Sequence, residues 1–123
     1  MDSRKTIVIA HAAYILLTAI WPIVHIESFI LVTGPKEDIW LVKTVGALLI
    51  PVGACLLACV AQPFRFPAFV LGAGTAVAFI VIDVHYALND VISDIYLADA
   101  LVEGIFLVGW IYVFAGDSKN VRP

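Results

Sequence analysis

Six ionisable side chains fall within the long apolar stretches of this chain. A charge there is costly unless it is paired with an opposite charge or binds a ligand. The six residues are His11, Lys43, Asp83, His85, Asp99 and Glu103. Ionisable groups in such surroundings commonly mark sites that bind ions, protons or ligands. Asp99 and Glu103 are four residues apart, so they share one face of a helix. The sequence therefore predicts a site built from acids on helix faces.

If the polar helix faces turn inward, they form a pocket at one end of a helix bundle. The predicted lining is His25, Glu27, Lys43, Asp83, Tyr86, Asp99 and Glu103, with Glu27 and Tyr86 at the rim. Several carboxyls in one apolar site do not all ionise, so at least one keeps its proton near neutral pH unless a cation compensates. We expect such a pocket to bind a small ligand, a cation or a proton.

A purely structural interpretation of the same charges stays open. Lys43 would pair with Asp83 or Glu103, and the other polar groups would reach the membrane interface. Lys43 also begins a row of small residues on one helix face, continued by Ala47, Ala54 and Ala58. Small residues allow close helix packing in membranes. A polar stripe of His11, Tyr14, Thr18 and His25 follows the first apolar stretch, and His11 is expected to be a satisfied packing residue.

No metal site is predicted. Asp83 and His85 are two residues apart, so on a helix they point to nearly opposite faces. Glu27 and Glu103 have no histidine three residues later, unlike the acids of di-iron helix bundles. Cys55 and Cys59 read as free thiols rather than as a redox motif. Nucleotide-binding motifs and basic nucleic-acid patches are absent from the sequence, so neither partner is expected.

The composition identifies the solvent of this chain as a lipid bilayer. Its 123 residues are 63% hydrophobic and 14% charged, with a mean hydropathy of +1.04. Soluble domains are about 45–50% apolar and about 25% charged. A soluble chain of this size has no means of hiding so many apolar side chains from water.

We predict an all-α integral membrane four-helix bundle in a single domain, residues 1–123. A membrane helix needs about 20 mostly apolar residues. Four stretches satisfy this, at about 7–24, 39–61, 67–88 and 95–116, with Pro or Gly in the gaps between them. Residues 23–38 are predicted to form a short amphipathic segment, and Asp38 to cap the second span.

The basic residues predict the orientation in the membrane. On one side of a four-span layout lie Arg4, Lys5, Arg65, Lys119 and Arg122, whereas the other side has Lys36 and Lys43. Cytoplasmic loops carry the excess of Lys and Arg. We therefore expect both termini in the cytoplasm, a location in the cell's inner (plasma) membrane, and an acidic outer half that attracts cations.

Part of the sequence resembles the small four-helix bacterial membrane proteins grouped as DoxX-like. The resemblance lies in Trp21-Pro22, Ser28-Phe29, the run from Val32 to Lys36 and the run from Trp40 to Gly46, together with the number of spans. It implies a prokaryotic inner-membrane protein with a long segment after the first span. Some DoxX-like proteins are linked to quinone-coupled sulfur oxidation. No functional residue and no cofactor is carried over from the resemblance.

Three classes of function follow from the sequence. We favour a transporter or channel component with an outward-facing acidic pocket, which with four spans would act as a homo-oligomer or in a larger membrane complex. The first alternative is a membrane-embedded enzyme or quinone-linked redox subunit, although the residues do not favour an enzyme. The second is a structural or accessory subunit without a ligand.

Overall fold

The computed structural model describes residues 2–62 and 65–120, with side chains for 2–62 and 66–116. These residues form α1 (Ser3–Val24), α2 (Ile26–Thr33), α3 (Ile39–Cys59), α4 (Arg65–Leu88) and α5 (Ile95–Asn120). Within the described ranges, four helices are long and apolar enough to cross a membrane. The prediction of an all-α chain with four such helices is therefore confirmed, and α2 occupies the segment predicted to be amphipathic.

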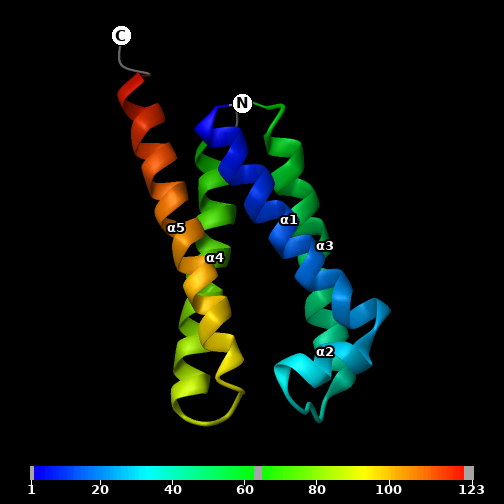
Figure 1. Cartoon of the computed structure of the whole chain (residues 1–123). Coiled ribbons are helices and arrows are strands. Elements are labelled where there is room, and N and C mark those ends of the chain that lie inside the picture. Colours follow the sequence, from blue (N-terminus) through cyan, green and yellow to red (C-terminus); the bar gives the residue numbers. More distant parts are fainter. Residues whose placement is uncertain (1, 63–64, 121–123) are drawn as a thin grey trace.

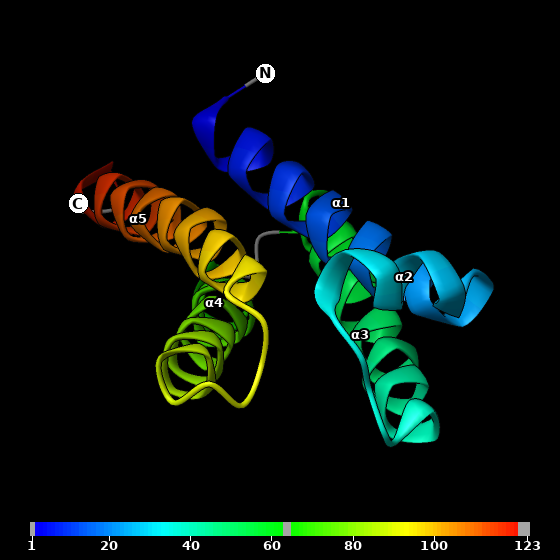
Figure 2. The same ribbon diagram turned by 60° about the horizontal axis from the view of Figure 1, so that its bottom comes forward.

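The four long helices form two antiparallel pairs, α1 with α3 and α4 with α5 (Figure 1). Both chain termini lie at one end of the molecule, which we call the terminal end. The two pairs meet there and diverge toward the opposite end, where α2 contacts α1 and α5 (Figures 1 and 2). We call this opposite end the α2 end.

The contact between α1 and α3 depends on two glycines of α3. A Cβ at Gly46 would lie 2.5 Å from the Ala19 carbonyl oxygen, and one at Gly53 would lie 2.6 Å from the Leu16 side chain. Apolar side chains gain little by leaving lipid for protein, so close backbone packing is a main source of helix association in membranes. The glycines allow that approach.

The predicted row of small residues on α3 is not the packing face. Ala47, Ala54 and Ala58 are all exposed, and so is Lys43 at the head of the row. The face that meets α1 is displaced by one residue and carries Gly46 and Gly53. Glycine allows a closer backbone approach than alanine, so it determines which face of α3 turns inward.

A buried apolar cluster joins the two pairs. Its residues are Val8, Ala12, Ile15, Leu56, Cys59, Ala68, Ala73 and Trp110. The Trp110 indole occupies the space above Gly72 on α4, where any Cβ would overlap it. Outside this cluster, large apolar side chains such as Leu17, Leu101 and Val108 are exposed on the helix surfaces. Such surfaces suit contact with lipid rather than with water.

The ends of α2 are held by polar side chains. His25 caps its first turn by accepting the Ser28 backbone N–H through Nδ1 at 3.2 Å, and Trp21 Nε1 donates to Ser28 Oγ at 2.8 Å. Beyond α2 the chain turns at Gly34, whose φ is 101°. Asp38 is the N-cap residue of α3, as predicted, but its side chain makes no cap hydrogen bond.

Replacing Gly46 by alanine should weaken the α1–α3 contact. We expect Gly46→Ala to lower the free energy of unfolding by about 1–3 kcal/mol, because the added methyl group meets backbone that cannot yield cheaply. The matched control is Gly74→Ala on α4, where an added Cβ meets nothing within 4 Å. Thermal unfolding in mild detergent, followed by circular dichroism, measures both. Equal melting temperatures for the two variants would contradict this account of the interface.

Candidate functional site

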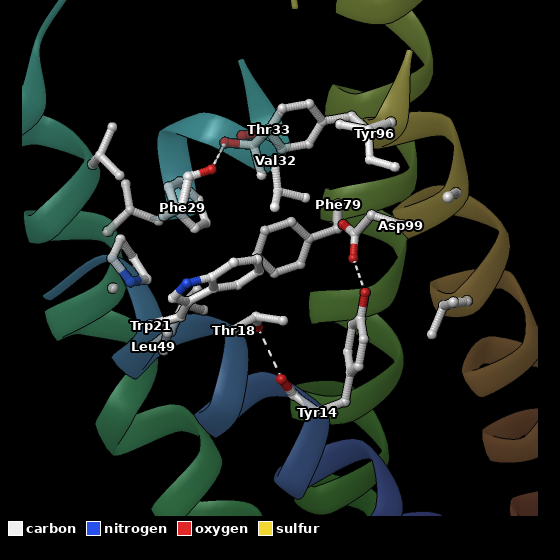
Figure 3. A pocket seen from close by; sticks show the side chains of 18 of the residues that line it. Tyr14, Thr18, Trp21, Phe29, Val32, Thr33, Leu49, Phe79, Tyr96 and Asp99 are labelled. Atoms are coloured by element: carbon white, nitrogen blue, oxygen red, sulfur yellow. Dashed lines mark hydrogen bonds between the residues drawn. The ribbon is translucent and has the colours of Figure 1, made fainter. Parts of the chain in front are cut away.

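A cavity of about 410 Å³ lies between the two helix pairs, toward the α2 end (Figure 3). Its walls come from α1, α2, α3 and α5, with Phe79 contributed by α4. Most of the lining is aliphatic or aromatic, including the rings of Trp21, Phe29 and Phe79. Cavities of about 300–1,000 Å³ with mostly apolar walls and a few polar groups are typical of small-molecule sites.

The polar wall of the cavity is formed where α1 faces α5. The Tyr14 hydroxyl donates a hydrogen bond to Asp99 Oδ1, as Figure 3 shows. Glu103 lies one helical turn further along α5 and also lines the cavity. Thr18, another lining residue, donates its own hydroxyl to the Tyr14 carbonyl oxygen at 2.9 Å. Two carboxyl groups therefore belong to this wall.

A third carboxyl, that of Asp83 on α4, contacts Asp99 from behind the lining. Asp83 is only 3% exposed, and its Oδ2 finds no hydrogen-bond partner among the described residues. Its carboxyl lies within hydrogen-bonding reach of Asp99, and the charges acting on it come from Asp99 and Glu103, both acidic. Two carboxyls can bond each other only through a proton, so the contact between Asp83 and Asp99 is favourable when the pair shares one.

Glu103 is held by a histidine rather than by another acid. It is 1% exposed, and His11 of α1 is fully buried beside it. His11 Nε2 lies 2.9 Å from Glu103 Oε2. On the other side of the ring, Trp110 Nε1 donates to His11 Nδ1 at 2.9 Å. This chain of hydrogen bonds runs from the cavity wall into the buried cluster at the terminal end.

Among the described residues that line the cavity, the one basic side chain is that of Lys36, at the α2 end. Lys36 Nζ lies 5.1 Å from the centre of the Tyr96 ring and 6.0 Å from that of Phe29. It also donates to the carbonyl oxygens of Thr33, at 3.2 Å, and Gly34, at 3.0 Å. A positive charge is favourable there, because the C-terminus of a helix is the negative end of its dipole. The cavity is thus basic at this end and acidic along α5.

The structure brings together three of the residues predicted to form the pocket and separates the others. Asp99 and Glu103 line the cavity, and Asp83 contacts Asp99. The remaining four are exposed outside the lining: His25 at the start of α2, Glu27 on α2, Lys43 on α3 and Tyr86 on α4. The lining also contains side chains with polar groups that the prediction missed: Tyr14, Thr18, Trp21, Thr33, Lys36 and Tyr96.

The suggested ion pair of Lys43 with Asp83 or Glu103 is not formed among the described side chains. Glu103 is bonded to His11 instead, and the α3 face that carries Lys43 points away from α1. The stripe of His11, Tyr14 and Thr18 along α1 was the signal for these partners.

Within the described part of the chain, no group of three His, Cys, Asp or Glu side chains is arranged to hold a metal ion.

Fold and site together define a class: an all-α chain, with four helices suited to crossing a membrane among its described residues, that encloses an acid-walled apolar cavity. Comparison of this chain with protein-family models, curated proteins and solved structures found no match. The chemistry of the cavity is therefore the basis for assigning a function.

The His11–Glu103 contact can be tested by removing its acceptor. We expect Glu103→Ala to lower the free energy of unfolding by about 1–3 kcal/mol, because the buried His11 N–H loses its partner. Glu103→Gln keeps an amide oxygen that can accept the same bond and should lose less than half as much. Glu27→Ala, at an exposed acid of α2, is the control and should change little. A Gln variant as unstable as the Ala variant would show that hydrogen bonding is not what holds Glu103.

Proposed function

We propose that this chain is a small multi-pass membrane protein that binds an organic cation in exchange for a proton. The observation that supports this most directly is the Asp83–Asp99 pair, a buried carboxyl contact with acidic neighbours at the wall of an apolar cavity. Such a pair can lower its charge in two ways, by holding a proton or by accepting a cation.

The walls of the cavity favour an organic cation over a metal ion. Trp21, Phe29 and Phe79 present aromatic surface, on which alkylated ammonium groups are well accommodated. Metal cations such as Ca²⁺ or Mg²⁺ need six or more oxygen ligands, and the lining offers few. A ligand with an apolar body and one positive charge matches both the apolar walls and the acids along α5.

Proton exchange follows from the same arrangement. When a cation approaches Asp99, the negative charge of the fully ionised pair is compensated, so the shared proton is free to leave. When the cation leaves, a proton must return, because two adjacent carboxylates in an apolar site repel each other strongly. Binding of the two positive species is therefore mutually exclusive.

The distribution of basic residues supports an orientation with both termini in the cytoplasm of a cell whose inner (plasma) membrane holds the protein. In that orientation the α2 end and the cavity face the outside, so the cation would be taken from the external medium. A transport role would require a path across the whole membrane. Four spans enclose one most readily when two copies associate, so we infer that the transporting unit is a homo-oligomer.

Binding of benzyltrimethylammonium to the purified protein in mild detergent tests this function. Its charge does not titrate, and neopentylbenzene is a neutral control of the same shape. Calorimetry at about pH 6 and about pH 8 should give tighter binding at the higher pH, by up to tenfold per pH unit for each proton released. The neutral control should bind more weakly and independently of pH.

Substitutions of single acids show whether the pH dependence of cation binding comes from the Asp83–Asp99 pair. Asp99→Asn should abolish the pH dependence and weaken cation binding at least tenfold, because the amide neither ionises nor releases a proton. Asp90→Asn removes an exposed acid of the α4–α5 connection, and its φ of 57° suits asparagine, so it is the matched control. Equal affinity for the charged and neutral probes, or no pH dependence in the unaltered protein, would refute cation–proton exchange.

Lys36 allows a test of the sign of the ligand charge. Lys36→Gln removes a positive charge from the α2 end of the cavity and frees the Tyr96 and Phe29 rings, so we expect benzyltrimethylammonium to bind several-fold more tightly. Lys43→Gln, at an exposed lysine outside the lining, should have no such effect. If Lys36→Gln instead weakens the cation and phenylmethanesulfonate is the better ligand of the unaltered protein, the site is one for anions.

A further inference from the structure

Both ring nitrogens of His11 are engaged, and the two partners differ in what they can do. The Trp110 indole N–H is a donor only, and it points at His11 Nδ1 from 2.9 Å. Nδ1 must therefore carry a lone pair and no proton. The single ring proton of neutral histidine is then on Nε2, which donates to Glu103 Oε2 at 2.9 Å. In this structure His11 is a neutral imidazole of one defined tautomer.

The surroundings prevent the ring from reversing these roles. His11 is fully buried, and its ring stacks on Phe106 with 4.5 Å between centroids. Trp110 is 4% exposed, and its indole packs so closely on Gly72 that a Cβ at that position would overlap it. A turned ring would bring Nε2 to Trp110 and Nδ1 to Glu103 only by displacing one of these neighbours.

The ionisable groups that face His11 from α4 and α5 are acidic, and one basic residue of α1, Arg4, lines a small hollow together with Trp110. Of the helices packed against α1, α5 contributes Glu103, which bonds His11, and Asp99, which bonds Tyr14. α4 contributes Asp83, the partner of Asp99, and α3 contributes the Cys59 thiol to the buried cluster. These acids would favour a positive charge on His11. What opposes it is the Trp110 N–H, since a proton on Nδ1 would set two donors against each other at 2.9 Å.

We propose that Trp110 is a positioning residue of the cation site, acting through His11 on Glu103. By occupying Nδ1 it keeps His11 neutral and directs the Nε2–H toward Glu103. A charged His11 would neutralise the acid wall and remove the attraction for a cation. While Trp110 donates to His11, the protons exchanged by the site therefore belong to the carboxyl groups of Asp83, Asp99 and Glu103 and not to His11. The tautomer assignment stands on geometry, whereas its effect on ligand binding rests on the proposed function.

Nitrogen-15 NMR of histidine-labelled protein tests the tautomer without any ligand. In a His25→Gln, His85→Gln background, His11 is the only labelled ring. We expect a bare Nδ1 and a protonated Nε2 in the unaltered protein, as the contacts with Trp110 and Glu103 require. Trp110→Phe retains a ring but lacks the donor, so His11 should show both tautomers.

Two controls separate this effect from a general loss of packing. Trp40→Phe, at an exposed residue of α3, should leave the His11 signals unchanged. Benzothienylalanine placed at position 110 keeps the indole shape but replaces the N–H by sulfur, so it should reproduce the Trp110→Phe spectrum with the packing preserved. A protonated Nδ1 in the unaltered protein, or unaltered His11 signals with benzothienylalanine, would overturn the assignment.

The link to the ligand site has its own readout, the pH dependence of benzyltrimethylammonium affinity. With either change at Trp110, His11 charges at low pH and must lose that proton before the cation binds. The dependence should then steepen by up to a further tenfold per pH unit at the acid end. An unchanged slope would refute the positioning role even with the tautomer confirmed. Absence of cation binding in the unaltered protein refutes the proposed function and leaves the NMR test intact.

Discussion

The arrangement of this molecule depends on the cost of placing carboxyl groups among apolar helices. Asp83, Asp99 and Glu103 are gathered within one short stretch of the α4–α5 pair, where ionised acids are unfavourable unless a proton, a donor or a cation compensates them. α1 supplies the donors: Tyr14 to Asp99 and His11 to Glu103. The polar stripe of α1 thus explains how the two helix pairs are joined, since apolar contact alone contributes little to helix association in lipid.

The two ends of the molecule have different packing because their residues differ. Toward the terminal end, Trp110 fits over Gly72 and an apolar cluster fills the space between the pairs. At the α2 end, α2 contacts both α1 and α5, and the cavity remains between the two pairs. The acids lie between these regions. They are reached from the cavity on one side and closed off by the His11–Trp110 contact on the other.

The sequence was sufficient to predict the helices and the acids, but not the neighbours of each helix. Hydropathy identified the four long helices, because span length follows from bilayer thickness. Helical periodicity placed Asp99 and Glu103 on one face, and both line the cavity. Periodicity defines the faces of a helix without saying what each face meets. Lys43 was therefore turned inward with its alanine row, whereas the neighbouring face with Gly46 allows the closer approach and forms the contact.

The same limit explains why Lys43 was considered as a partner of Asp83 or Glu103. Counting charges favours Lys43, because a buried acid is expected to seek a cation. The structure provides a neutral histidine instead, with its tautomer fixed by Trp110. A lysine partner would have cancelled the charge of the acid wall within the protein itself. A neutral donor satisfies the hydrogen bonding of Glu103 but leaves the negative charge of the acid wall uncompensated. A cationic ligand can compensate that charge.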